Sequence, residues 1–239
     1  MIITETYERQ KLYAFAAEFL ASHGAGAVLD LACVDGEGSE LLARRIPSVV
    51  GVDLDADLIR SAKQKFPRQN LIFKTGDALK TDFPDANFDG IVSSHTLEHF
   101  GAEDQLLLLR ELQRITKPGG IIIISTPDRT VWRLQGIAGM QKDHIRELTR
   151  REAEALFRET GLRLDRVFGQ ELLRPGNLHL RRFLNFLKKM DVLRLRRILS
   201  DRMMASVDEG TQPVILTGEV KELRPGDLSS ILIFVCRKA

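Results

Sequence analysis

The residues best suited to chemistry lie in one short stretch, residues 93–100, with the sequence SSHTLEHF. His95, Glu98 and His99 have the spacing H-x-x-E-H, which within a helix can place two histidines on a zinc ion beside a catalytic glutamate. Here the motif directly follows the apolar run FDGIVSS, so we expect it in a turn between a strand and a helix. This position predicts a structural role for Glu98 and His99 without a bound metal. A divalent-cation site and a zinc hydrolase are the alternatives.

Two histidines are candidates for a general base. An imidazole titrates near neutral pH, so His99 can take a proton from a hydroxyl group. His144, in the segment KDHIREL, follows the fifth apolar run, where we expect a substrate to enter. For both residues a structural or solvent-exposed role is the alternative interpretation.

Carboxylates and glycines follow three successive apolar runs. Asp30, Gly36 and Gly38 belong to DLACVDGEGS, and a glycine lets the backbone approach a ligand closely. Asp53 ends the second run, where a carboxylate can accept hydrogen bonds from both hydroxyls of a ribose. Asp77 follows the third run and can accept a hydrogen bond from the exocyclic amine of adenine. Together these residues predict an adenosine-shaped site.

Alternating strands and helices must position these residues. Continuous apolar strands that alternate with helices indicate a parallel sheet with helices on both faces. Ligands of such sheets bind outside the carboxyl ends of the strands, which is where the polar residues collect. Asp55 is predicted to cap a helix. The expected strands are residues 27–33, 48–54, 71–77, 88–94 and 121–126, and the expected helices are residues 4–23, 39–45, 56–65 and 102–115.

The later part of the chain is less regular. Thr149 and Glu152 predict a capping box for a helix over residues 151–160, and residues 162–169 and 230–238 predict two more strands. Residues 171–210 are expected to form a basic helical insertion, or lid, within a single domain of residues 1–239. Residues 174–202 contain nine Arg or Lys against two Asp, with apolar residues at helical spacing. A solvated lid and a surface for a membrane or an anionic acceptor are both open interpretations.

Five segments, in this order and spacing, resemble the class I S-adenosylmethionine (SAM)-dependent methyltransferases of the small-molecule type. They are VLDLACVDGEG, VVGVDLDADLIRSAK, GDALKTDFPDANFDGIVSSHTLEHF, LRELQRITKPGGIIIISTP and HIRELTRREAEALFRETGL. The resemblance implies an α/β fold with a Rossmann-like, mostly parallel sheet of seven strands and an antiparallel last strand. It also implies SAM as the cofactor, and methyl transfer to a small-molecule acceptor such as a metabolite, a lipid precursor or a sugar.

The resemblance also implies roles for individual residues. Asp53 would hold the ribose, and Leu54 would lie against the adenine, whose edge would meet Asp77 and Ala78. The first turn would lie near the amino-acid end of the cofactor, and the end of the fourth strand would lie beside its methionine portion. The residues there are Asp30, Ala32, Gly36 and Gly38 in the turn, and Ser94 and His95 after the strand.

The first turn departs from the family pattern D-x-G-x-G-x-G, because Ala32 and Val34 replace the first two glycines. A β-branched residue such as Val34 disfavours positive φ and adds bulk where the cofactor would lie. One interpretation is weakened or reshaped SAM binding. The other is a turn that keeps a negative φ here, with Val34 pointing away. The first leaves open a second hypothesis, a non-catalytic or weak SAM-binding protein of the same fold that acts through the basic insertion.

Two other binding sites are alternatives. Some O-methyltransferases of this fold carry E-x-x-E-H after the fourth strand and bind a divalent cation. His95 replaces the first glutamate here, and a His-Glu-His set would favour zinc over magnesium. A nicotinamide-binding Rossmann domain would also use Asp53 on a ribose, but the segment CVDGEGSELL lacks the pattern G-x-G-x-x-G.

Composition excludes several classes of protein. The chain has 239 residues, of which 44% are hydrophobic and 28% charged, so a folded domain is expected rather than a disordered chain. A net charge of +2 and a scarcity of aromatic residues argue against a nucleic-acid partner. The polar N-terminus and the short apolar runs predict a cytoplasmic protein. Cys33 and Cys236 are expected to be free, buried thiols.

Overall fold

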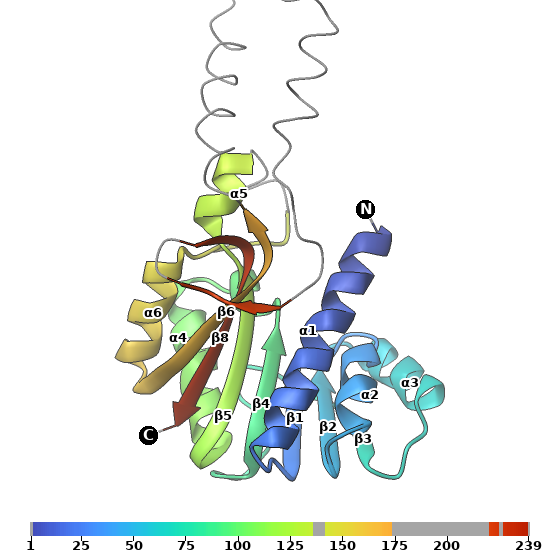
Figure 1. Cartoon of the computed structure of the whole chain (residues 1–239). Coiled ribbons are helices and arrows are strands. Elements are labelled where there is room, and N and C mark those ends of the chain that lie inside the picture. Colours follow the sequence, from blue (N-terminus) through green and yellow to red (C-terminus); the bar gives the residue numbers. More distant parts are fainter. Residues whose placement is uncertain (1, 136–141, 174–219, 225–226, 239) are drawn as a thin grey trace, which may run out of the picture.

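One twisted sheet of eight strands organises the molecule (Figure 1). The computed structural model describes residues 2–135, 142–173, 220–224 and 227–238. The strand order is β3-β2-β1-β4-β5-β8-β6-β7. The first five strands are mutually parallel, and β8 lies antiparallel between β5 and β6. The strands are β1 (Ala27–Leu31), β2 (Ser48–Asp53), β3 (Leu71–Thr75), β4 (Phe88–Ser94), β5 (Thr116–Pro127), β6 (Leu162–Leu173), β7 (Lys221–Glu222) and β8 (Leu228–Lys238).

The predicted fold class is therefore confirmed, with one correction to the number of strands. The sheet has eight strands instead of seven, because β7 adds a two-residue antiparallel edge to β6. A segment as short and polar as Lys221–Glu222 carries no apolar alternation, so its sequence does not predict a strand.

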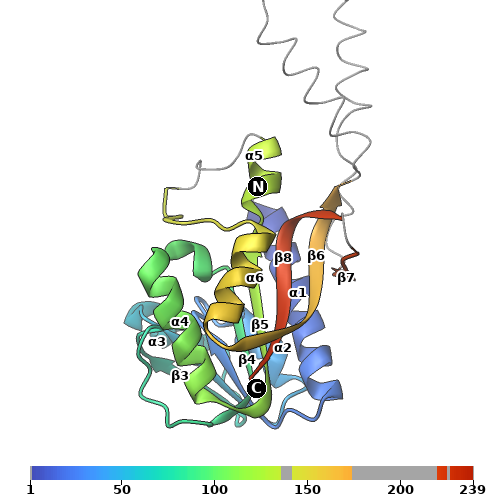
Figure 2. The same ribbon diagram turned by 90° about the vertical axis from the view of Figure 1, so that its left-hand side faces the viewer.

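Helices cover both faces of the sheet. The helices α1 and α2 lie on one side, and α4 and α6 on the other (Figure 2). Val28 and Leu29 are neighbours in β1, yet they belong to the two different hydrophobic clusters, because successive strand residues point to opposite faces. The central strands carry buried apolar residues on both faces for this reason. The helices are α1 (Ile2–Ser22), α2 (Glu37–Ala43), α3 (Ala56–Lys65), α4 (Ala102–Ile115), α5 (Arg129–Gln135) and α6 (Arg150–Glu159).

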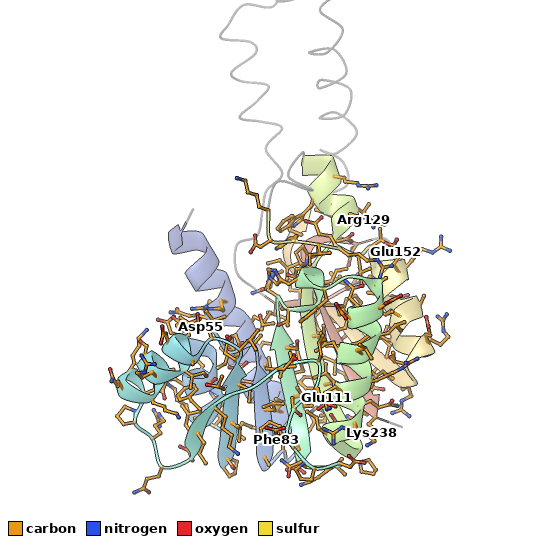
Figure 3. The ribbon with its side chains drawn as sticks, turned by 180° about the vertical axis from the view of Figure 1, so that it is seen from behind. Asp55, Phe83, Glu111, Arg129, Glu152 and Lys238 are labelled. Atoms are coloured by element: carbon orange, nitrogen blue, oxygen red, sulfur yellow. The ribbon has the colours of Figure 1, made fainter. Side chains whose placement is uncertain are left out.

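Capping side chains explain where two of the helices begin. The Asp55 carboxylate accepts hydrogen bonds from the backbone N–H groups of Asp57 and Leu58, at 2.8 and 3.2 Å, and starts α3. Thr149 and Glu152 form a complete capping box at the start of α6. Both predicted caps are confirmed. Figure 3 shows Asp55 and Glu152 in place.

The predicted basic insertion falls almost wholly outside the described residues. Its expected start at residue 171 is wrong, because β6 continues to Leu173 and pairs with β8 along its whole length. Among the helices that the structure describes, none has the length and apolar character needed to cross a bilayer. Cys33 and Cys236 are both buried and free, as predicted.

Candidate functional site

The carboxyl ends of β1, β2 and β3 meet at one edge of the sheet. The Cys33 N–H, just after β1, donates to the Val52 carbonyl at 2.9 Å, and the Gly76 N–H, just after β3, donates to the Asp53 carbonyl at 2.9 Å. Asp53 and Asp77 therefore lie at the same edge. This is the juxtaposition that the predicted adenosine site requires.

The turn after β1 takes up a glycine-like backbone without the glycines. Ala32, Val34 and Gly36 have φ values of 59°, 52° and 79°. Of the two interpretations of this turn, the one with a negative φ at Val34 is therefore wrong. The Val34 side chain is 43% exposed, and its backbone N–H donates to Asp53 Oδ2 at 2.9 Å. The turn therefore has positive φ at all three of these positions, with the isopropyl group of Val34 at its surface.

Gly36 and Gly38 are small because protein side chains pack against them. A Cβ atom on Gly36 would lie 2.7 Å from the Phe73 ring, and one on Gly38 would lie 2.3 Å from the Tyr13 ring. A larger residue at either position would collide with a side chain of the protein itself, so the small size of both glycines has a structural cause. Direct contact of either glycine with a cofactor stays a prediction.

Asp30 lies beneath the turn instead of at its surface. Its side chain is fully buried, with Oδ1 accepting from the Tyr13 hydroxyl at 2.8 Å and Oδ2 from the Ser39 hydroxyl at 2.6 Å. Burial raises the pKa of Asp30 to about 6, although both hydroxyl donors act in the opposite direction. Asp30 therefore supports the turn from below and has no surface for a ligand.

The groups at the ends of β2 and β3 fit a nucleoside. Each oxygen of the Asp53 carboxylate accepts one backbone N–H, from Val34 and from Asp55, so each keeps a lone pair for a ribose hydroxyl. Leu54 is 74% exposed, an unusual amount for an apolar side chain, and it offers a surface for a flat base. Asp77 is exposed and uses Oδ1 to accept from the Leu79 N–H, which leaves Oδ2 without a bond to a described residue.

The remaining predicted cofactor residues lie nearby. Ala78 is half-buried beside Asp77. Ser94 ends β4 and accepts from the Ser125 hydroxyl at 3.1 Å. His95 follows with a φ of 51°, and its N–H donates to the Ser125 carbonyl at 3.0 Å. Because β4 is the neighbour of β1, these residues lie at the same edge of the sheet as the first turn.

The H-x-x-E-H motif lies in a turn, as predicted, with a short 3-10 helix over Leu97–His99. Glu98 is fully buried, and its two oxygens accept from His95 Nδ1 and from Thr126 Oγ1, both at 3.1 Å. Burial would raise the pKa of Glu98, but the hydrogen bond and charge of His95 outweigh burial and leave this pKa below its ordinary value. Glu98 is therefore held as a carboxylate.

The two candidate bases, His99 and His144, are brought together. Their ring centroids lie 5.1 Å apart, with the ring planes nearly perpendicular. His99 Nδ1 lies 3.0 Å from the Asp143 carbonyl oxygen, and His144 Nδ1 lies 3.0 Å from Glu147 Oε1. Since both acceptors are oxygens without a proton, each Nδ1 donates and each Nε2 carries the free lone pair.

The residues that place His144 were not predicted from the sequence. The Ile145 and Arg146 N–H groups donate to the Glu98 carbonyl at 2.9 and 3.0 Å, which fastens this segment to the turn. Arg129, at the start of α5, donates to the Glu147 carbonyl and forms an ion pair with Glu152 (Figure 3). Trp132 stacks on the His144 ring at 5.6 Å. No local pattern predicts contacts between segments so far apart in the chain.

Comparisons with known proteins agree with this architecture. Residues 29–124 match the family model described as a methyltransferase domain. A probable S-adenosylmethionine-dependent methyltransferase from Mycolicibacterium smegmatis is 29% identical over 142 residues, 59% of this chain and 54% of the relative. A ubiquinone/menaquinone biosynthesis C-methyltransferase from Desulfotalea psychrophila is 33% identical over 108 residues, 44% of this chain and 43% of the relative. The chain thus spans about half the length of these curated relatives.

Solved structures show the same fold over nearly the whole chain. A crystal structure described as a putative methyltransferase from Bacillus halodurans superposes with a TM-score of 0.62 at 18% identity. The match covers 94% of this chain and 98% of that one. At this identity the likeness speaks for the fold alone.

Proposed function

Because this chain belongs to the class I S-adenosylmethionine-dependent methyltransferases, we propose that it transfers a methyl group from SAM to a small-molecule acceptor. The observation that carries the proposal is the shared edge of β1, β2 and β3, where Asp53, Leu54 and Asp77 present a nucleoside-shaped set of groups. When bound, SAM supplies an electrophilic methyl group on a sulfonium.

The residues of the chain have three tasks in this proposal. Asp53 orients the ribose, and Leu54 covers the base, so that the cofactor is fixed before the acceptor arrives. An acceptor hydroxyl must lose its proton, and Nε2 of His99 or of His144 is the free base at the turn after β4. An organic acceptor suits the apolar surface beside them, where Trp132 stacks on His144 and Ile145 is 70% exposed.

A small-molecule acceptor has further support from the relatives. One of them is named for methylation in ubiquinone and menaquinone biosynthesis. The alternative of a non-catalytic SAM-binding protein rested on Val34. Val34 has a φ of 52° and is 43% exposed at the surface of the turn, so binding of SAM to the wild-type protein tests this alternative.

Calorimetry with SAM tests the cofactor site. Wild-type protein is expected to bind SAM, and Asp53→Asn is expected to bind it about 10- to 100-fold more weakly, since a hydrogen bond to a charged group contributes about 1.5–3 kcal/mol. Asp57→Asn is the matched control. This variant removes one negative charge four residues after Asp53. The Asp57 side chain is 80% exposed and pairs with Arg60 at 2.9 Å, so it has no place in the proposed cofactor site.

Activity is then measured with radiolabelled SAM against a panel of hydroxylated metabolites, lipid precursors and sugars. Methyl transfer by the wild-type protein, lost together with SAM binding in Asp53→Asn, supports the proposal. Equal SAM affinity in Asp53→Asn and Asp57→Asn would contradict the proposed cofactor site.

A further inference from the structure

Three side chains with metal-binding atoms converge beside the turn after β4. Glu98 and His99 come from the 3-10 helix, and His144 comes from the segment after α5. One ligand atom from each of the three lies within 4.8 Å of the other two, so a single ion can reach all three. The set differs from the sequence motif, because His144 takes the place of His95.

On both imidazoles Nδ1 is already engaged with an oxygen, which leaves Nε2 as the nitrogen for a metal. Nδ1 of His99 donates to the Asp143 carbonyl, and Nδ1 of His144 donates to the Glu147 carboxylate. Each Nε2 is thereby left as a lone-pair donor. Metal-binding histidines in proteins typically donate their second ring N–H to a carbonyl or a carboxylate, which fixes the tautomer and the ring orientation.

Glu98 supplies the negative charge. It is fully buried, and each oxygen accepts one hydrogen bond, from His95 and from Thr126. A carboxylate oxygen has two lone pairs, so one remains on each oxygen for a cation. His95 thus orients Glu98 through this hydrogen bond, which explains why a histidine stands at this position without belonging to the converging set.

The backbone holds the three residues in place before any ion arrives. The N–H groups of Ile145 and Arg146 donate to the Glu98 carbonyl. The Gln105 side chain donates to the Leu97 and Arg146 carbonyls, both at 2.9 Å, and so bridges the two segments. Little ordering of the chain is therefore needed on binding, which favours affinity.

We propose that Glu98, His99 and His144 form a binding site for a divalent transition metal, with zinc as the favoured ion. Two imidazoles and one carboxylate are a zinc ligand set, and three protein ligands leave a fourth position open. An acceptor hydroxyl at that position would lose its proton more readily, and the ion would then replace a free histidine base. This catalytic role rests on the proposed function, whereas the metal site itself does not.

Calorimetric titration of metal-free, full-length protein with Zn²⁺ tests the site. Wild-type protein is expected to bind one ion at this site, and His99→Gln and His144→Gln are each expected to weaken that binding at least about tenfold. His23→Gln is the matched control, because His23 is an exposed histidine at the far end of α1. Absence of zinc binding by the wild type, or equal affinity in all three variants, would overturn the proposal.

Two further measurements guard against misfolded variants. Glu147→Gln keeps the shape of the His144 partner, and it is expected to weaken zinc binding about tenfold as an outer-shell change. Zn²⁺ should raise the melting temperature of the wild type but not of His144→Gln, since an ion that binds only the folded state stabilises it. A melting temperature that rises equally in both would count against the site.

The same samples separate this proposal from the proposed function. Asp53→Asn is expected to lose SAM affinity and to bind zinc like the wild type. Asp53 ends β2, whereas the proposed metal ligands Glu98 and His99 follow β4. Zinc binding without SAM binding in the wild type would refute the methyltransferase and keep the metal site. SAM binding without zinc binding in the wild type would keep the proposed methyltransferase and refute the metal site.

Discussion

At the scale of single residues, Val34 holds a backbone conformation that favours glycine. Its φ of 52° is sterically costly for a β-branched residue, and such positions cost about 1–3 kcal/mol. The position is held by two neighbours. The Val34 N–H donates a hydrogen bond to the Asp53 carboxylate. Gly36, two residues further along the turn, packs against the Phe73 ring. The fold therefore stores strain at the edge where a cofactor would bind.

Val34→Gly is expected to stabilise the protein by about 1 kcal/mol. Glycine removes the strain of positive φ but adds about 0.5–1 kcal/mol of unfolded-state entropy, so the net gain is smaller than the strain itself. Urea unfolding of wild type and variant measures the difference. Ala86→Gly is the control, because Ala86 has a φ of 53° but is exposed and not β-branched, and should gain less. A destabilised Val34→Gly would show that the side chain packs favourably in the turn.

Individual site residues were predictable where they follow a strand. Asp53, Leu54 and Asp77 could be placed from sequence, because the carboxyl ends of parallel strands share one edge. Contact of Gly36 and Gly38 with a cofactor stays a prediction, and the sequence does not reveal that protein rings also pack against both residues. The proximity of His144 to Glu98 was not predictable, because more than forty residues separate the two in the chain and no local sequence pattern specifies that contact.

At the scale of elements, Asp30 joins three of them. It lies in β1, and its carboxylate receives the hydroxyl of Tyr13 from α1 and that of Ser39 from α2. The Tyr13 ring also fills the space over Gly38 in α2. A buried carboxyl thus fixes two helices against the strand whose end carries the first turn.

This junction predicts a pH dependence of stability. Burial raises the pKa of Asp30 from 3.8 to about 6, so the folded state binds this proton more tightly than the unfolded state does. The resulting stabilisation is fully present below about pH 4 and is lost as the pH rises through about 6. The change amounts to about 3 kcal/mol.

Comparison of wild type with Asp30→Asn isolates this contribution. The variant lacks the titrating proton, so its unfolding free energy, measured by urea at each pH, should fall less than that of the wild type between pH 4 and pH 6.5. Other carboxyls cancel in the difference. Parallel profiles for the two proteins would mean that Asp30 keeps an ordinary pKa when folded.

Element boundaries were predictable where a cap or a break fixes them. The helices over Ala56–Lys65 and Ala102–Ile115 have the predicted ends, and Asp55 supplies the reason for the first. The first strand was predicted to reach residue 33 but ends at Leu31, because the chain turns to positive φ at Ala32. The short helix α5 was not predicted, because its seven residues show no clear apolar period, although Asp128 caps its start by accepting from the Thr130 N–H at 2.8 Å.

At the scale of the whole molecule, the eight strands of the described residues form one continuous sheet. Leu173 at the end of β6 pairs with Leu228 at the start of β8, so the two ends of the long connection are neighbours in one antiparallel ladder. The described part of the core, on both faces, comes from residues before and after this connection. Closing a long loop costs only slightly more entropy than closing a short one, so its length adds little to the stability of the sheet.

Replacing residues 174–219 with a short Gly/Ser linker is therefore expected to leave a folded protein that still binds SAM. Its melting temperature should stay within a few degrees of the wild-type value, and SAM affinity within about twofold, because Asp53, Leu54 and Asp77 lie at the far side of the sheet order from β6.

Methyl transfer to the acceptor should fall at least about tenfold if this segment recognises the acceptor, as its nine basic residues between 174 and 202 suggest. A control variant keeps the segment but replaces Arg196 and Arg197 with Gln. It distinguishes an effect of the basic charge on methyl transfer from an effect of the segment as a whole. Full activity of the linker variant would assign acceptor recognition to the edge around Trp132, His144 and Ile145 instead.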